Sequence, residues 1–376
     1  MPKISIILPT YNGQLYIREA IESVIKQIFK DWELIIVDDC SSDNTLDIIK
    51  EYEKLDSRIR VIHNEVNKKL PASLNIGFSY AKGEYFTWTS DDNLYLPSAL
   101  YRMNLYLDEN PDEIMVCTGY SIIDENKKVL YNAERYDSDN MFINNYVGAC
   151  FLYRNCVLED VGVYNTSKFL VEDYEYWLRI LFEYGNIGYI DDVLYYYRTH
   201  KGSLTTQKKK EIHNKLLELR KEYLLQIVYN LRKRKDLLCQ VFYEFKVANM
   251  LNKEIRDLFY EIVPELKIDC GIIKNEKTVV YGAGKYGEKV YQKYSSIIDC
   301  YVDKNKGGLL YDKKIFPTEQ LRILKKEHQI LVAASLQNIY SLLKTLIDND
   351  IYECVVVIFE WEWFYQQFYH CIFNKY

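Results

Sequence analysis

EYFTWTSDDN, at residues 84–93, is a short apolar run that ends in two adjacent carboxylates, Asp91 and Asp92. Its length and aromatic content predict a β-strand, and Pro97 shortly afterwards is typical of the start of a helix. Two carboxylates at the carboxyl end of a strand are poorly placed for a core, but they suit a hard divalent cation, which takes oxygen ligands. The alternative is a solvated turn in which an Asp caps the next helix, and the pair taken alone favours that alternative.

Two upstream apolar runs also end in polar residues. Residues 4–8 lead into Pro-Thr-Tyr-Asn at 9–12, and residues 33–37 lead into Asp-Asp-Cys-Ser-Ser-Asp at 38–43. A helix between these two strands is predicted by apolar residues at i, i+3, i+4, i+7 spacing: Ile17, Ala20, Ile21, Val24, Ile25 and Ile28.

The predicted strands and helices alternate along this part of the chain. A further helix is expected from about Thr45, and a further strand at residues 60–62, ahead of the strand that leads to Asp91. This alternation predicts an α/β fold with a mostly parallel sheet. Ligands of such open sheets bind beyond the carboxyl ends of the strands, so three polar clusters on one rim predict a ligand site there.

The motifs of residues 1–205, taken in order, resemble those of glycosyltransferase family 2, which has the GT-A nucleotide-diphospho-sugar transferase fold. The motifs that carry the resemblance are Pro9-Thr10-Tyr11-Asn12, Val37-Asp38-Asp39, Asn75 with Gly77 and Gly83, Asp91-Asp92, Glu172-Asp173 and Tyr197-Arg198-Thr199-His200. The resemblance implies a bacterial inverting enzyme of cell-surface polysaccharide synthesis. Such an enzyme moves a sugar from a nucleotide-diphospho-sugar, with UDP-hexose as the expected donor class, to a hydroxyl of a glycan or lipid-linked glycan.

The resemblance also implies roles for individual residues. The donor-binding residues would be Pro9 and Tyr11 beside the base, and Asp39 as acceptor from a base N–H. Asp91 would lie by the ribose and diphosphate. Asp92, with Asp91, would form the site for Mn2+ or Mg2+. In the pair Glu172-Asp173, Asp173 would be the catalytic base. The chain departs from the family pattern twice: Ser90 stands where many members have a third acidic residue, and Lys68-Lys69 where many have a glycine.

These residue types suit the chemistry of sugar transfer. Charge grows on the diphosphate as the glycosidic bond breaks, and a bound cation stabilises that charge. The acceptor hydroxyl is a poor nucleophile and needs a positioned base. A base on the opposite face of the sugar allows attack with inversion, so no nucleophilic Ser or Cys is required. The sequence contains neither a Gly-x-Ser-x-Gly elbow nor a Gly-x-x-x-x-Gly-Lys phosphate loop.

Two of the predicted site residues also have ordinary structural explanations. Glu172 and Asp173 precede a helical stripe, and carboxylates favour a helix N-terminus through capping and the helix dipole. The upstream motifs favour the base role for Asp173 over the cap. His200 could contact the metal, the diphosphate or the acceptor, and a purely structural role is an equal alternative.

Residues 206–272 are predicted to be a basic helical linker region. Ten Lys and Arg side chains between Gln207 and Lys235 face three Glu, with Leu, Ile and Val between them. A basic amphipathic helix can lie on an anionic membrane surface. Packing on the catalytic domain, with a solvated outer face, is the favoured alternative.

Residues 273–376 are predicted to form a small Rossmann-like α/β domain with an aromatic tail at 359–369. A strand at 278–281 precedes three glycines with Gly-x-Gly-x-x-Gly spacing, and an acidic residue follows about 20 positions later, as in dinucleotide-binding folds. A candidate nucleotide site therefore comprises Gly282, Gly284, Gly287 and Asp303. The domain is short for two mononucleotide halves, so a scaffold for packing or assembly is favoured over redox chemistry.

Composition sets outer limits. The 376 residues carry a net charge of −6, which argues against general nucleic-acid binding. The nine Cys include no Cys-x-x-Cys pair, which favours reduced thiols over a zinc site or disulfides. The chain starts directly in a strand and has no apolar run of about 20 residues. We therefore expect a cytoplasmic protein without a signal peptide; contact with the inner face of the membrane and homo-oligomer formation stay open.

Two other functions remain as alternatives. One is a nucleotidyltransferase of related fold, which the Pro-Thr-Tyr-Asn turn disfavours because a triphosphate calls for a Gly-rich, Arg-containing loop. The other is a non-catalytic nucleotide-sugar-binding assembly subunit built around residues 273–376.

Overall fold

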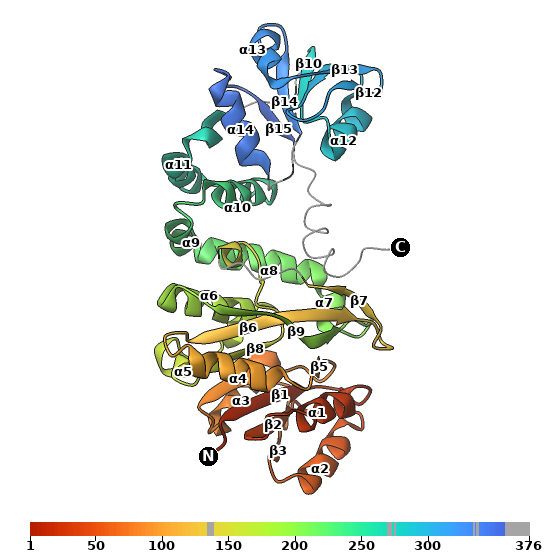
Figure 1. Ribbon diagram of the computed structural model, residues 1–376, viewed down its shortest axis with the longest axis vertical. Helices are drawn as coiled ribbons and strands as arrows, with labels where there is room; N and C mark the ends of the chain where they lie inside the picture. The colour runs from red at the N-terminus through yellow and green to blue at the C-terminus, as the bar shows by residue number, and fades with distance from the viewer. Residues whose placement is uncertain (134–138, 269–272, 274–275, 334, 336–337, 358–376) are drawn as a thin grey trace. The chain divides into compact units, whose positions relative to one another are not determined.

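The computed structural model describes residues 1–133, 139–268, 273, 276–333, 335 and 338–357 (Figure 1). The chain divides into two compact units between Tyr223 and Leu224. The finer division into 1–205, 206–272 and 273–376 stays a prediction, and the aromatic tail lies outside the described residues.

The first unit is built on a mixed sheet with the strand order β3-β2-β1-β4-β8-β6-β9-β5, and β7 pairs with β6. Its strands are β1 (Ile4–Thr10), β2 (Trp32–Asp38), β3 (Ile59–His63), β4 (Tyr85–Trp88), β5 (Leu94–Tyr95), β6 (Met115–Ile123), β7 (Val129–Asn132), β8 (Phe151–Arg154) and β9 (Gly188–Arg198). The four strands β3, β2, β1 and β4 are parallel neighbours, whereas β8 runs antiparallel to both β4 and β6. The predicted α/β fold is confirmed.

Helices alternate with the parallel strands, as the sequence predicts. The α-helices of this unit are α1 (Ile17–Ile25), α2 (Thr45–Leu55), α3 (Leu70–Tyr80), α4 (Ala99–Glu109), α5 (Val157–Asp160), α6 (Glu172–Tyr184), α7 (Leu204–Gln207) and α8 (Lys209–Glu222), and the 3-10 helices are η1 (Asn140–Phe142) and η2 (Thr166–Lys168). On α8, which belongs to the first unit, Leu216, Leu217 and Leu219 are buried.

The stripe predicted for α1 is mostly correct. Ile17, Ala20, Ile21 and Val24 are fully buried in the core cluster with residues of β1 and β2. Ile28 is an exception, since α1 ends at Ile25 and the Ile28 side chain is 61% exposed. The apolar spacing therefore continues one residue, Ile28, past the point where the backbone leaves the helix.

β1 occupies the centre of the parallel part and is buried along its whole length. Its register sets Ile4 beside Trp32 of β2 and Tyr85 of β4, and it ends with Thr10 beside Asp38. Carboxyl ends of parallel strands meet at one edge of a sheet. The three polar clusters therefore follow strands that end at the same rim.

The second unit joins helices to a smaller sheet. Its helices are α9 (Leu224–Asn230), α10 (Lys235–Val247), α11 (Lys253–Ile262), η3 (Pro264–Ile268), α12 (Lys285–Tyr294), η4 (Thr318–Gln320), α13 (Leu321–Leu324) and α14 (Ile339–Asp348). The sheet has the order β12-β13-β11-β10-β14-β15. Its strands are β10 (Thr278–Tyr281), β11 (Ile298–Val302), β12 (Gly308–Leu310), β13 (Lys313–Phe316), β14 (Gln329–Ala333) and β15 (Val355–Val357). The parallel run β13-β11-β10-β14-β15 is the expected Rossmann-like arrangement.

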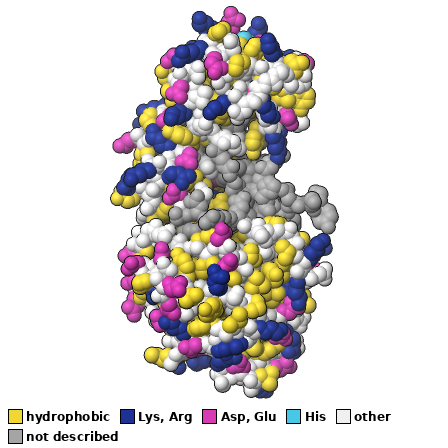
Figure 2. All heavy atoms as spheres, viewed as in Figure 1, with side chains coloured by type: hydrophobic (Ala, Val, Ile, Leu, Met, Phe, Trp, Pro, Cys, Tyr) yellow, Lys and Arg dark blue, Asp and Glu magenta, His cyan; other side chains and the backbone are white. Residues whose placement is uncertain are grey.

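The surface agrees with the modest net charge. On the face shown in Figure 2, acidic and basic side chains are interspersed rather than segregated. In the part of the chain that the structure describes, none of the helices combines the length and the apolar character needed to cross a membrane.

The turn from β10 into the first turn of α12 contains three glycines, and two of them shape it. Gly282 has φ +110°, and a Cβ there would lie 2.4 Å from the Ala333 carbonyl oxygen. A Cβ on Gly287 would lie 2.1 Å from the Gly282 carbonyl oxygen. A Cβ on Gly284 would have no atom within 4 Å. The first and third glycines are therefore required for chain packing, and the second is not.

This asymmetry predicts unequal effects of two alanine substitutions. Gly282→Ala combines an unfavourable backbone conformation with a backbone clash and should destabilise the second unit by about 3 kcal/mol or more. Its melting transition should fall by about 10 °C. Gly284→Ala, the matched control, should melt close to the wild type. Equal melting of the two variants in a calorimetric scan would contradict the packing argument.

Candidate active site

Asp91 lies against the end of β1. Its Oδ2 accepts a hydrogen bond from Thr10 Oγ1 at 2.5 Å. Gly13, just beyond β1, allows this approach, because a Cβ there would lie 2.2 Å from the same carboxylate oxygen. Loops that are far apart in sequence thus converge on one carboxylate at the rim.

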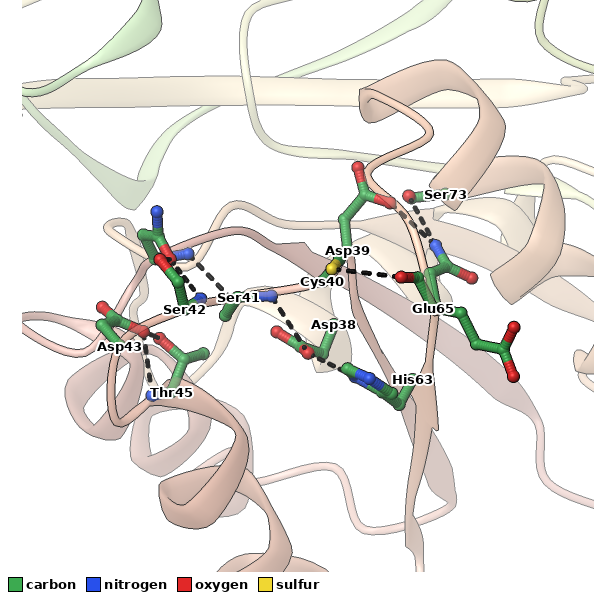
Figure 3. A network of polar contacts seen from close by, with 12 residues as sticks. Asp38, Asp39, Cys40, Ser41, Ser42, Asp43, Thr45, His63, Glu65 and Ser73 are labelled. Atoms are coloured by element: carbon green, nitrogen blue, oxygen red, sulfur yellow. Dashed lines mark hydrogen bonds and ion pairs between the residues drawn. The ribbon is translucent and has the colours of Figure 1, made fainter.

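The two carboxylates that follow β2 have different surroundings, and Figure 3 shows them pointing to opposite sides of the chain. Asp38 is fully buried, and its Oδ2 lies 2.7 Å from His63 Nδ1. Asp39 accepts hydrogen bonds from the Asn64 side chain and from the backbone N–H groups of Lys68 and Lys69, each at 2.8 Å. Asp38 therefore ties β2 to β3, while Asp39 holds the loop that precedes α3.

The hydrogen bonds of Asp39 bear on its predicted role. A carboxylate has about four acceptor positions, and the loop occupies three of them. One position therefore remains for a base N–H. His63 and Asn64, which complete this network, have no signal in the sequence, because a single His or Asn after a strand is typical of many turns.

Lys69 occupies a backbone conformation that normally requires glycine. Its φ is 72° and its ψ is 163°, a region that side chains other than glycine rarely enter. Lys69 belongs to the Lys68-Lys69 pair, which the resemblance sets where many family members have a glycine. The hydrogen bond from its N–H to Asp39 holds the strained residue in place, and its ammonium lies 5.9 Å from the Phe169 ring centre.

Asp92 and His200 lie next to each other at the rim. His200 Nε2 lies 3.1 Å from Asp92 Oδ2, and the His200 ring packs on Tyr16 with centroids 4.9 Å apart. The structure thus brings the last residue of the Tyr-Arg-Thr-His motif to the predicted metal ligand. His200 contacts the site, which favours the functional alternative over the purely structural one.

Arg198 fixes the backbone at Asp92. Its guanidinium, 1% exposed, donates to the carbonyl oxygens of Asp92 at 2.8 Å and Glu125 at 3.0 Å and to Glu19 Oε2 at 2.6 Å. It also stacks over Tyr16 at 4.6 Å. A planar guanidinium with several donors suits this task, which a lysine would not perform.

The surroundings of Asp91 and Asp92 fit a divalent cation. Asp92 Oδ1 is buried and accepts no hydrogen bond within the described part of the chain. Burial and the adjacent Asp92 charge raise the pKa of Asp91 well above its usual range. A cation held by Asp91 and Asp92 would give Asp92 Oδ1 a partner and would offset the repulsion between the two carboxylates. No group of three or more His, Cys, Asp and Glu that could hold a metal is present among the described residues.

Glu172 and Asp173 start α6, as the sequence predicts. Asp173 Oδ1 accepts from the Tyr174 N–H at 2.7 Å, and its Oδ2 accepts from Asn145 Nδ2 at 2.8 Å. Burial raises the pKa of Asp173, and burial together with the Asp173 charge raises that of Glu172. Both pKa values are therefore raised, and a higher pKa makes a carboxylate a better proton acceptor. Asn145 had not been identified from the sequence.

Tyr197 is affected by the charges of both Asp92 and Asp173. Its hydroxyl pairs with Thr205 Oγ1 at 3.0 Å. Burial raises its pKa to about 12, and the charges of Asp92 and Asp173 both add to this effect. Tyr197 is therefore within electrostatic range of both the predicted metal ligand and the predicted base.

The other predicted residues occupy less decisive places. Pro9 is buried within β1, whereas Tyr11 is 52% exposed beyond the strand end. In the second unit, Asp303 Oδ2 accepts from the Ala283 N–H at 2.8 Å, and its Oδ1 accepts from the N–H groups of Asn305 and Lys306. Asp303 is therefore engaged in holding the glycine loop, and a nucleotide there stays a prediction.

A sheet of the GT-A type with carboxylates after its strand ends is the architecture of a glycosyltransferase domain. Residues 5–162 match the model of glycosyl transferase family 2. The chain therefore carries a domain of this family.

Relatives and solved structures agree with this assignment. An uncharacterized glycosyltransferase of Rickettsia typhi is 31% identical over 215 residues, which cover 54% of this chain and 66% of that protein. The putative teichuronic acid biosynthesis glycosyltransferase TuaG of Bacillus subtilis is 32% identical over 151 residues, 39% of this chain and 60% of that protein. The crystal structure of S. aureus TarS 1–349 in complex with UDP-GlcNAc has a TM-score of 0.51 at 19% identity, covering 69% of this chain and 79% of that one. At this identity the likeness shows the fold.

The strained backbone at Lys69 gives a testable reversal of a general trend. At an ordinary site alanine is more stable than glycine by about 0.5–1 kcal/mol. At residue 69 we expect Lys69→Gly to be more stable than Lys69→Ala by about 1 kcal/mol, because only glycine relieves the strain. Both variants lack the ammonium, so their difference in denaturant midpoint isolates the backbone. An alanine variant as stable as the glycine variant would show that the backbone is not strained.

Proposed function

We propose that this chain is a metal-dependent inverting glycosyltransferase. It moves a sugar from a nucleotide-diphospho-sugar, of the UDP-hexose class, to a hydroxyl of a glycan or lipid-linked glycan in cell-surface polysaccharide synthesis. The observation that carries this proposal is the placement of two acidic pairs: Asp91-Asp92, held by Thr10 and His200, and Glu172-Asp173 at the start of α6. Tyr197 lies within electrostatic range of Asp92 and Asp173. One group suits a cation and diphosphate, and the other suits proton removal.

Similar proteins support the donor class and the setting. S. aureus TarS has been crystallised with UDP and with UDP-GlcNAc, and TuaG carries a name that refers to teichuronic acid. These properties belong to those proteins. They make UDP-sugars the first donors to test here. The proposal also includes a cytoplasmic location and no nucleic-acid partner.

On the donor side, Asp92 would hold Mn2+ or Mg2+ with Asp91 beside it. Such a cation supplies Lewis-acid stabilisation of charge on the departing diphosphate. His200 orients Asp92, and Arg198 fixes its backbone, so the carboxylate is aimed before the donor binds. Asp39 offers its remaining acceptor position to the base, and the half-exposed ring of Tyr11 offers a stacking surface.

On the acceptor side, Asp173 takes the proton from the attacking hydroxyl. The hydroxyl oxygen forms the new bond to the anomeric carbon as the bond to the diphosphate oxygen breaks. The proton passes to Asp173, and the diphosphate leaves with the bonding electrons. Inversion follows because the base and the leaving group lie on opposite faces of the sugar.

Turnover with a panel of nucleotide-sugars tests the reaction class. Glycosyl transfer releases a nucleoside diphosphate, a nucleotidyltransferase would release pyrophosphate, and a non-catalytic binding subunit would release neither. Release of nucleoside diphosphate that depends on an added glycan acceptor is the expected result. Pyrophosphate release would overturn the proposal.

Asp92→Ala should abolish the metal-dependent part of this turnover. We expect a loss of about 100-fold or more, as for removal of a group that stabilises developing charge. Diphosphate binding in the presence of Mn2+ should weaken too, while thermal unfolding should stay near that of the wild type. Asp47→Ala, on the exposed side of α2, is the control and should retain activity. Full activity of Asp92→Ala, or of the wild type in excess chelator, would exclude the metal role.

Asp173→Asn should lower turnover by about 100-fold or more, with donor binding nearly unchanged. The wild-type pH profile should show the same group. A base must be ionised to accept a proton, so kcat/KM should fall as pH drops through its raised pKa, above the ordinary Asp value of 3.8. The Asn variant should lack this acid limb. Loss of donor binding with turnover preserved per bound donor would instead make Asp173 a donor ligand.

A further inference from the structure

Asn145 lies in the loop that follows η1, and η1 and this loop are each joined to the first turn of α6 by one hydrogen bond. Asn145 Nδ2 donates to Asp173 Oδ2 at 2.8 Å, and the Tyr174 hydroxyl donates to the Met141 carbonyl oxygen at 2.8 Å. Phe142 of η1 stacks on Phe182 of α6, with centroids 5.9 Å apart. The loop and the helix therefore hold each other in one register.

The Asn145 amide has a single workable orientation at this place. Its N–H2 faces the carboxylate, and a flip would set its carbonyl oxygen against the same negative charge. Its own Oδ1 is buried and has no hydrogen-bond partner within the described residues. In this orientation the Asn145 amide donates to Asp173, and its own carbonyl oxygen is left without a hydrogen bond from the described residues.

We propose that Asn145 is a positioning residue for the catalytic base, holding the Asp173 carboxylate toward the acceptor and keeping it ionised at neutral pH. This inference rests on the proposed function of Asp173. Asp173 Oδ1 is fixed by a backbone N–H of its own helix, so the donor from Asn145 decides how the second oxygen is oriented. A hydrogen bond to the charged form favours that form, and thus opposes the effect of burial.

Other groups also act on this carboxylate and define what the test must separate. Glu172 precedes it on α6, and Lys215 of α8 acts on Glu172. Tyr164 and Tyr197 both sense the Asp173 charge. None of these side chains is changed by substitution of Asn145, so a shift in titration on substitution reports the lost amide.

The chain offers a closely matched control. Asn104 on α4 donates from Nδ2 to Asp108 Oδ2 at 2.9 Å, and its Oδ1 is likewise buried without a partner. The Asn104 pair repeats the bond of the Asn145 pair but is directed at a carboxylate that has no proposed part in catalysis. Comparing the two Asn→Ala variants therefore separates the effect on the base from the general cost of losing such a bond.

The experiment is the pH profile of kcat/KM for wild type, Asn145→Ala, Asn145→Asp and Asn104→Ala. Loss of the amide should move the acid limb up by about 1 pH unit, the size expected for a hydrogen bond to a charged group. Asn145→Asp, which keeps the shape, should move it further because it adds a like charge. Asn104→Ala should leave the limb in place. An unmoved limb in Asn145→Ala, or an equal shift in Asn104→Ala, would overturn the proposal.

A second readout does not depend on turnover. Carboxyl NMR of aspartate-labelled protein, with the Asp173 signal assigned by its loss in Asp173→Asn, should show a higher Asp173 pKa in Asn145→Ala. An unchanged pKa would refute the role of Asn145 even if no donor has been found. Conversely, a raised pKa with no turnover in the wild type would refute the proposed function alone.

Discussion

Parallel pairing of β1 with β2 on one side and β4 on the other is the constraint on which the site depends. Because the three strands run in the same direction, the polar residues that follow them reach one rim, where Thr10 meets Asp91 and stands beside Asp38. Burial of the whole of β1 makes the pairing rigid. The loops that carry the carboxylates start from these fixed strand ends, so the sheet keeps the carboxylates close to one another.

The sequence predicts the parts of this arrangement that are local. A strand followed by polar residues marks Asp39, Asp91 and Asp92, and an acidic pair before a helical stripe marks the start of α6. The family resemblance adds the order of the motifs and the roles. The Rossmann-like order of the second sheet follows from the same alternation of strands and helices, and Ile28 shows its limit, since spacing does not reveal where a helix ends.

Contacts between distant segments could not be predicted in this way. Asn145 is 28 residues from Asp173, and Arg198 is 179 residues from Glu19. Nothing in the composition around Asn145 distinguishes it from Asn144, and only the packing of η1 on α6 selects it. Likewise, Asp303 has the spacing of a ribose ligand, yet its carboxylate holds the glycine loop, because backbone N–H groups nearby compete for the same oxygens.

The long reach of Arg198 has a consequence for the order of events during synthesis. The segment around Asp92 leaves the ribosome early, but the guanidinium that fixes it is made about a hundred residues later, and a ribosome adds about 5–20 residues per second. For about 5–20 seconds, therefore, the carboxylates of the nascent chain lack the Arg198 guanidinium that fixes the backbone at Asp92. The negative charges of the first half of the domain are therefore not balanced by Arg198 until β9 pairs with β6 and β5. The site is complete only when this last strand of the sheet has formed.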